Sequence, residues 1–254
     1  MTRHRPLFSI IIPTLNEEKY LPRLLRTIAA QSLKENIVDV HIADGGSRDA
    51  TLKNACSFVS KLPIHTHSHK KGNVAAQRNS GAQLAKGEYL LFVDADTQLR
   101  PDFLHELKNI IDTHPHGIYI PYFGPDDHSI LLRMSYIFMN KVVCLSKHLP
   151  RPLSSIGCVG IEKALFDAVD GYDTSIYIGE DHNLVRRARA AGGAVVCASK
   201  AVSVFSLRRL RREGVLRSLL ILFFGIGYAL IRGDIRKKYF SYEMGGHNYR
   251  DIKK

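Results

Sequence analysis

The sequence of 254 residues has no tryptophan, and its four cysteines form no CxxC pair. Scattered cysteines in a chain of this length are typical of buried thiols in a reducing compartment, so we expect no disulfide framework. The glycine-rich phosphate loops GxGxxG and GxxxxGKS/T are also missing. These absences argue against a disulfide-stapled scaffold and against a dinucleotide-binding or P-loop site.

The apolar run near the C-terminus is too short for a typical membrane-spanning helix. The 14 residues from Ser218 to Ile231 carry no charge, whereas a span needs roughly 20 apolar residues. Basic flanks favour an anionic membrane surface, so we expect peripheral membrane contact through 207–240. Packing in the core or between subunits is the second interpretation, and a true span the third. The apolar segment 129–145 is interpreted as an ordinary packed helix.

Acidic residues are scarce only in the C-terminal part. The net charge is +12, and residues 200–254 contribute +9 of it through 13 Lys and Arg against 4 Asp and Glu. The remaining residues therefore carry only +3. A nearly neutral globular part without a basic-aromatic stripe argues against nucleic acid as a partner. The N-terminal segment is basic, but its apolar run is broken at Pro13 and is too short for the core of a signal peptide. We therefore expect a cytoplasmic protein on the inner face of the cell membrane.

Strand-like apolar runs alternate with helical periodicity through the first half of the chain. The runs at 8–12, 38–44, 63–67 and 88–96 are each followed by a segment with helical spacing. This alternation predicts an α/β fold with an open, mostly parallel sheet flanked by helices. We expect one domain over 1–206 and a basic, apolar helical tail over 207–254.

Polar clusters follow three of these strands. They are PTLNEE at 13–18, ADGGS at 43–47 and DAD at 94–96. In parallel α/β sheets, ligands bind outside the carboxyl ends of the strands, so the clusters predict one site. Two aspartates around a small alanine suit Mg²⁺ or Mn²⁺ with a substrate phosphate. A solvated strand end explains DAD equally well, and an ordinary turn explains the glycine pair better.

A fourth cluster opens the segment YIGEDHNLVRRARAAGG at 177–193. Its acidic residues lie in the first turn of a predicted helix and its arginines follow, which matches the helix dipole. Dipole matching therefore explains the charges, but it does not explain why GYDTSIYIG leads into them.

Together, PTLNEE, ADGGSRDAT, GNVAAQRNSGAQLAKGEYLLFVDADT and the late GED resemble the family 2 inverting glycosyltransferases, which have the GT-A fold. The resemblance covers roughly residues 7–205, with four motifs in the family's order. It implies a first nucleotide-contacting loop with Glu17 at the ribose, and an aspartate bonded to the base. It also implies a basic residue near the diphosphate and a D-x-D pair. The corresponding residues are Pro13, Thr14, Asn16, Glu17, Asp44, Arg78, Asp94 and Asp96.

The same resemblance assigns the chemistry. Asp181 is expected to be the catalytic base, with Glu180 beside it in the acceptor site. Asp96 is the more direct metal ligand, and Asp94 lies nearer the ribose and phosphate. A base on the acceptor hydroxyl and a cation on the leaving diphosphate are the two charges that inverting transfer requires.

The sequence departs from the family pattern at two places. Relatives often have a histidine after the last strand that completes the metal site, whereas VSVFSLRR places Phe205 and Ser206 there. The Q-x-x-R-W signature of processive polysaccharide synthases is absent, which argues against iterative polymer synthesis.

We therefore predict a metal-dependent inverting glycosyltransferase that moves a sugar from a UDP- or GDP-sugar to an acceptor hydroxyl. A lipid-linked or cell-envelope glycan is the acceptor class considered. Two alternatives stay open: a nucleotidyltransferase of the same fold, and a non-catalytic module that binds a nucleotide sugar or a membrane surface.

Overall fold

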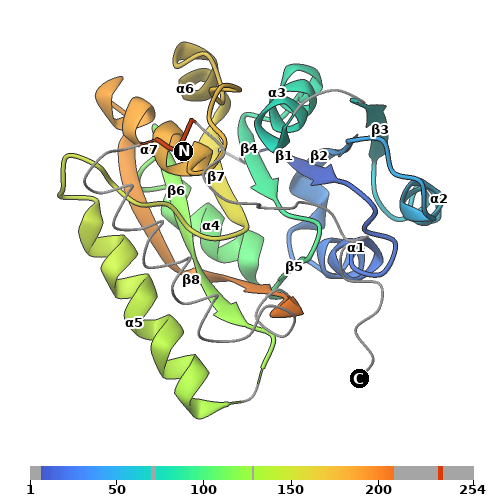
Figure 1. Ribbon diagram of the computed structural model, residues 1–254, viewed down its shortest axis with the longest axis horizontal. Helices are drawn as coiled ribbons and strands as arrows, with labels where there is room; N and C mark the ends of the chain where they lie inside the picture. The colour runs from blue at the N-terminus through green and yellow to red at the C-terminus, as the bar shows by residue number, and fades with distance from the viewer. Residues whose placement is uncertain (1–6, 70–72, 128, 209–233, 237–254) are drawn as a thin grey trace, which may run out of the picture.

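The computed structural model describes residues 7–69, 73–127, 129–208 and 234–236. The strands form one sheet in the order β3-β2-β1-β4-β7-β6-β8-β5 (Figure 1). In chain order the elements are β1 (Phe8–Thr14), α1 (Leu21–Ala29), a 3-10 turn (Lys34–Asn36), β2 (Ile37–Asp44), α2 (Thr51–Cys56), β3 (Ile64–Ser68), α3 (Val74–Leu84), β4 (Tyr89–Val93), β5 (Thr97–Leu99), α4 (Phe103–Ile111), β6 (Gly117–Pro125), α5 (Ile130–Ser146), β7 (Cys158–Glu162), α6 (Lys163–Ala168), α7 (Glu180–Ala190) and β8 (Ala194–Phe205).

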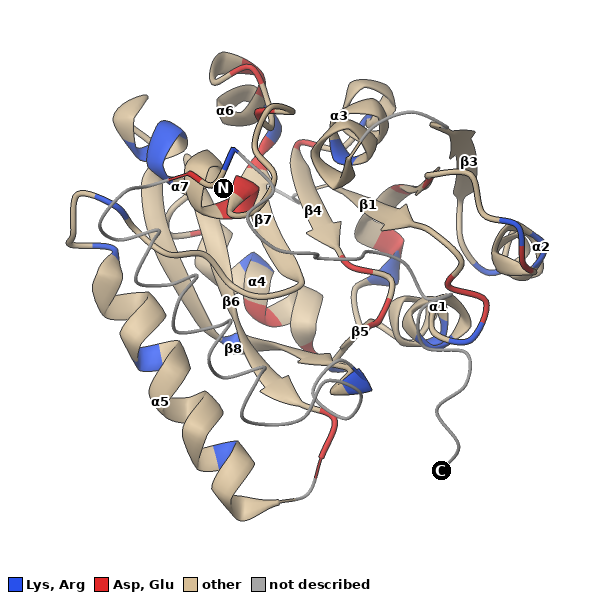
Figure 2. Cartoon of the chain, in the orientation of Figure 1, with Lys and Arg blue, Asp and Glu red and all other residues tan. Residues whose placement is uncertain are grey.

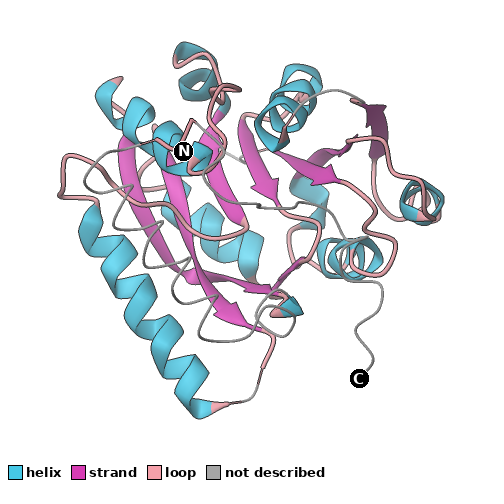
Figure 3. Ribbon diagram, viewed as in Figure 1, coloured by secondary structure: helices cyan, strands magenta, loops and turns pink. Residues whose placement is uncertain are grey.

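The first strand shows why this sequence forms a three-layered α/β structure. Every residue of β1 is buried. Ile10 and Ile12 pack with α1, α2 and α4 on one face of the sheet, and Ile11 packs with α3, α5, α6 and α7 on the other. A strand covered on both faces needs a continuous apolar run rather than an alternating one. Figure 3 shows the helices around the sheet.

The predicted fold class is confirmed, with one refinement. β1 runs parallel to β2 and β4, and β2 runs parallel to β3. In the other half, β7 runs antiparallel to both β4 and β6, while β6 and β8 are parallel. The carboxyl ends of β1, β2 and β4 therefore lie on the same side of the sheet, and the polar clusters follow them there.

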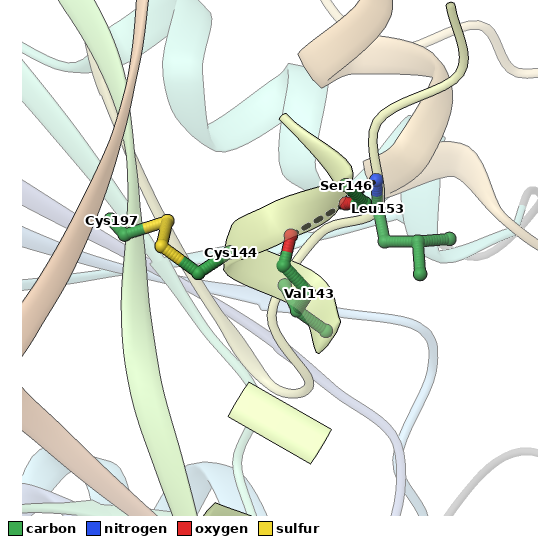
Figure 4. Close-up of a disulfide and its surroundings, with 5 residues drawn as sticks. All are labelled: Val143, Cys144, Ser146, Leu153 and Cys197. Carbon is green, nitrogen blue, oxygen red and sulfur yellow. Dashed lines mark hydrogen bonds between the residues drawn. A yellow bond between two sulfur atoms is a disulfide. The ribbon is translucent and has the colours of Figure 1, made fainter. Parts of the chain in front are cut away.

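The expectation of four reduced cysteines is wrong, because Cys144 of α5 and Cys197 of β8 form a disulfide (Figure 4). Only Cys56 and Cys158 are free. The bonded pair is 53 residues apart in sequence, and the two residues meet because α5 packs beside β6, which pairs with β8. The spacing of the cysteines therefore no longer supports a reducing compartment.

The helix α5 has a buried inner face and an exposed apolar outer face. Its inner face is fixed by buried Asn140, whose amide accepts from the backbone N–H of Phe123 at 3.0 Å and donates to its carbonyl at 2.7 Å. Its outer face carries six large apolar side chains that are 52–78% exposed, namely Ile130, Leu131, Met134, Ile137, Phe138 and Leu145. The expectation of an ordinary packed helix therefore describes only the inner face.

Most of the predicted tail over 207–254 lies outside the described residues, as does most of the membrane-contact segment 207–240. Its described parts contact the domain. Leu207 and Ile235 are both buried, and Ile235 forms an antiparallel bridge with Ile178. Among the described helices, none is long and apolar enough to cross a membrane.

Candidate active site at the strand ends

A single guanidinium connects the DAD turn to the GED segment. Arg78 of α3 is 3% exposed. Its Nη1 donates to Glu180 Oε1 and to Asp181 Oδ1, each at 3.0 Å, and its Nη2 donates to Asp94 Oδ1 at 2.8 Å. Residues that are about a hundred positions apart in the sequence therefore converge on one side chain. Figure 2 shows acidic segments after β4 and at the start of α7.

Tyr172 completes the surroundings of Arg78 and Asp181. Its hydroxyl donates to Asp181 Oδ1 at 2.9 Å, and its ring lies 5.1 Å from the guanidinium carbon of Arg78. Burial, and next the charge of Asp181, raise the pKa of Tyr172 well above its ordinary value, so the hydroxyl keeps its proton and donates. Sequence reasoning missed Tyr172, which stands in the GYDTSIYIG segment that dipole matching did not explain.

The three carboxylates around Arg78 outnumber its one charge. Burial alone would lower the pKa of Arg78, but Asp181, Asp94 and Glu180 outweigh it and raise this pKa well above its ordinary value. Burial and the neighbouring Asp181 raise the pKa of Glu180 from 4.5 to about 7, although Arg78 opposes them. Glu180 therefore keeps its proton to a higher pH than an exposed glutamate does.

A second guanidinium holds the other aspartate of the D-x-D pair. Arg208 donates from Nη1 to Glu17 Oε2 at 2.6 Å and from Nη2 to Glu17 Oε1 at 2.7 Å. Its Nε lies 3.1 Å from Asp96 Oδ2. Burial raises the pKa of Glu17 to about 7 despite this pairing. Sequence reasoning missed Arg208, although the arginine pair directly after the last strand was a visible signal.

The loops after β1 and β2 are bonded to each other. Asp44 accepts from the backbone N–H groups of Gly46 at 3.0 Å and Ser47 at 2.8 Å, and from the Thr14 hydroxyl at 3.2 Å. Asn16, at φ 55°, accepts from the N–H of Arg48 at 2.8 Å. Asp44 therefore caps its own turn, and its predicted contact with a base stays a prediction.

A buried amide positions these loops from behind. Gln77, the residue before Arg78, donates from Nε2 to the carbonyls of Thr14 and Ala43, each at 2.9 Å. A Cβ at Gly45 would lie only 2.8 Å from that nitrogen, so the first glycine of DGGS is required for close approach. Pro13 and Thr14, both buried, end β1 beside them.

The predicted residues thus fall into three neighbouring sets. Glu180, Asp181 and Asp94 meet at Arg78, and Glu17 and Asp96 meet at Arg208. The remaining nucleotide-loop residues lie at the ends of β1 and β2. Contacts alone assign none of them a role, so the individual assignments stay predictions.

The described residues do not fit a divalent cation in this arrangement. Asp94 and Asp96 each present an oxygen to a guanidinium, and both oxygens of Glu17 do the same. Among the described residues, no group of three or more His, Cys, Asp and Glu side chains could hold a metal ion. Mg²⁺ and Mn²⁺ require oxygen ligands that point at the ion rather than at another cation.

Comparison with known proteins identifies the family of this site. The sequence model described as "Glycosyl transferase family 2" matches residues 9–150. The poly(ribitol-phosphate) beta-N-acetylglucosaminyltransferase TarS of Staphylococcus aureus is 33% identical over 109 residues, which is 42% of this chain and 19% of TarS. A PGL/p-HBAD biosynthesis glycosyltransferase of Mycobacterium bovis is 38% identical over 112 residues, or 43% of each chain. The matched part therefore spans less than half of either relative.

Solved structures show the same fold. The crystal structure of Staphylococcus aureus TarS superposes with a TM-score of 0.61 at 25% identity, covering 79% of this chain and 35% of TarS. The mannosyltransferase PcManGT from Pyrobaculum calidifontis, in complex with GDP-Man and Mn²⁺, superposes with a TM-score of 0.66 at 20% identity. It covers 79% of this chain and 57% of that one.

Replacing Arg78 should lower the free energy of unfolding by more than replacing an exposed arginine does. Arg78→Ala leaves three carboxylates together without their cation, so we expect a loss of about 3–5 kcal/mol in the free energy of unfolding. Arg78→Lys should lose less, because it keeps the charge. Urea denaturation measures both, with the exposed Arg26→Ala as the matched control. A loss for Arg78→Ala below about 1 kcal/mol would contradict the central position of this guanidinium.

Glu180 should make the protein less stable as pH rises. Its pKa is about 7 when folded and 4.5 ordinarily. Between these values the folded state holds a proton that the unfolded state releases, so stability present below pH 4.5 is lost as pH rises through 7. Glu180→Gln should match the wild type at pH 4 and exceed it at pH 8 by up to about 3 kcal/mol. Parallel stability curves for the two proteins between pH 5 and 8 would refute this assignment.

Proposed function

Because the chain belongs to glycosyl transferase family 2, we propose that it transfers a sugar from a nucleotide-sugar donor to an acceptor hydroxyl with inversion at the anomeric carbon. The observation that supports this most is the link through Arg78. It brings the carboxylate of Asp181 next to that of Asp94 at the open edge of the sheet. Asp181, as the base for the acceptor, and Asp94, as a polar contact for the donor, then both bond to the same guanidinium.

In the proposed reaction, Asp181 removes the proton from the acceptor hydroxyl. The acceptor oxygen forms a bond to the anomeric carbon, and the bond from that carbon to the diphosphate oxygen breaks, with its electron pair leaving on the diphosphate. Arg78 and Tyr172 both bond to Oδ1 of Asp181, which orients the carboxylate. General base catalysis requires this fixed geometry before a matched pKa.

The donor class we propose is a UDP- or GDP-sugar. Relatives of the fold include TarS in complex with UDP-GlcNAc and PcManGT in complex with GDP-Man. The acceptor we propose is a lipid-linked or cell-envelope glycan, since the name of TarS refers to poly(ribitol-phosphate). The expected Mn²⁺ or Mg²⁺ stays a prediction, and no step above depends on it.

We also propose that the chain works at a membrane surface through the outer face of α5. Its exposed apolar side chains lie on the same helix as the exposed basic residues Arg133 and Lys141. A helix that is apolar on its outer face and carries basic charge suits the interface of an anionic bilayer. The expected cytoplasmic location remains a prediction.

Asp181→Asn should separate catalysis from binding. The amide cannot accept the acceptor proton, so we expect turnover to fall by about 10²–10⁴-fold, with nucleoside diphosphate affinity unchanged within about twofold. Turnover is measured as release of the nucleoside diphosphate, and affinity by calorimetry. Asp167→Asn, a surface carboxylate paired with Lys163, is the matched control and should keep full activity. Unchanged turnover in Asp181→Asn would exclude it as the base.

Charges on the outer face of α5 should abolish membrane binding. We expect the wild type to float with vesicles that contain phosphatidylglycerol, and the double variant Met134→Glu, Phe138→Glu to remain at the bottom of the gradient. Leu84→Glu changes a similarly exposed apolar residue on α3, so it serves as the control and should float normally. Equal flotation of all three proteins would place the membrane contact elsewhere or exclude it.

A further inference from the structure

The pairing of β5 with β8 determines where Arg208 lies. Thr97 of β5 is the register partner of Phe205, the last residue of β8. The ladder continues by one bond, since the backbone N–H of Ser206 donates to the carbonyl of Asp96 at 3.2 Å. The chain leaving β8 must therefore pass the D-x-D turn, at the place where the family resemblance leads us to expect a metal-binding histidine.

The guanidinium of Arg208 binds the carboxylate oxygens that would otherwise be ligands of a metal cation. It takes both carboxylate oxygens of Glu17 and lies against Asp96 Oδ2. Its outer plane is covered by the ring of Tyr20, 4.6 Å from the guanidinium carbon. Burial alone would lower the pKa of Arg208. The hydrogen bonds to Glu17 and the charges of Asp96 and Glu17 outweigh burial and raise this pKa above its ordinary value, so the side chain stays charged.

We propose that Arg208 supplies, from within the chain, the positive charge that a divalent cation supplies to a leaving diphosphate. This inference rests on the proposed function. When a donor binds, its diphosphate accepts from the Nη groups of Arg208 in exchange for Glu17, and the guanidinium keeps its contact with Asp96. As the bond to the anomeric carbon breaks, the electron pair goes to the diphosphate oxygen, and Arg208 stabilises the charge that develops there.

An arginine is chemically suited to this task. Its planar fork binds two phosphate oxygens at once, and its charge does not depend on pH in the range where the enzyme works. The stack on Tyr20 and the contact with Asp96 hold the fork at the strand ends without using the diphosphate. Asp96 then positions Arg208 through their ion pair and does not act as a metal ligand.

The first test measures nucleoside diphosphate binding by calorimetry, with UDP and GDP, in EDTA and in Mn²⁺. We expect the wild type to bind one of them in EDTA with an affinity within about threefold of that in Mn²⁺. Arg208→Gln should bind it at least about tenfold more weakly in EDTA, and Arg208→Lys by an intermediate factor. Arg23→Gln is the matched control, because Arg23 also lies over Tyr20, at 5.3 Å, but its side chain is exposed.

Rescue by metal distinguishes this role from a purely structural one. Removing the guanidinium opens the oxygens of Glu17 and Asp96, so Mn²⁺ should restore most of the affinity lost in Arg208→Gln. Turnover should follow the same pattern, with kcat in EDTA lower by about 10²–10³-fold, as for the loss of one charge-stabilising donor. A structural role would leave Mn²⁺ without effect on the variant.

Failure of this inference can be told from failure of the proposed function. Binding by the wild type that requires Mn²⁺ and is lost in EDTA would overturn the role of Arg208, while leaving the transferase reaction in place. A wild type that binds neither UDP nor GDP under any condition would overturn the proposed function and this inference with it. Loss of folding in Arg208→Gln, seen by its melting curve, leaves the wild-type comparison and Arg208→Lys to decide.

Discussion

The site depends on the burial of one arginine among three carboxylates. Arg78 is almost fully shielded from water, and so the desolvation of its charge must be offset by Asp94, Glu180 and Asp181. Burying such a group is unfavourable unless every charge has a partner with good geometry. The arrangement therefore fixes α3, the turn after β4 and the start of α7 relative to one another. Without it, Asp181 and Asp94 would have no common partner.

Negative charge still exceeds positive charge among the described residues of the site. Five carboxylates face two guanidinium groups, and two of those carboxylates have pKa values near 7 because burial is not fully compensated. A site of this kind favours an additional proton over an additional anion. Under the proposed function, a diphosphate must therefore displace some carboxylate contacts when it enters, and Glu17 is the partner of Arg208 whose charge is most easily given up.

Local patterns carried the fold and much of the site, but not its pairings. The apolar runs and the polar clusters after them located β1, β2 and β4 and brought Asp94 and Asp181 into consideration. Tyr172, Gln77 and Arg208 were missed because their importance comes from partners that are distant in sequence. The same is true of Cys144 and Cys197, whose spacing carries no signal until α5 lies beside the sheet. Propensity and periodicity predict elements, whereas these contacts depend on how the elements pack.

The D-x-D motif illustrates that limit most sharply. From the sequence, Asp94 and Asp96 are both expected at one metal site, with Asp96 as the more direct ligand and Asp94 nearer the ribose and phosphate. In the structure, β4 ends at Val93 and β5 begins at Thr97, so the turn between them directs the two carboxylates to different partners. Asp94 belongs to the Arg78 group with Asp181, and Asp96 belongs to the Arg208 group with Glu17. One turn thus connects the Arg78 group to the Arg208 group, because its two aspartates pair with two different guanidinium groups.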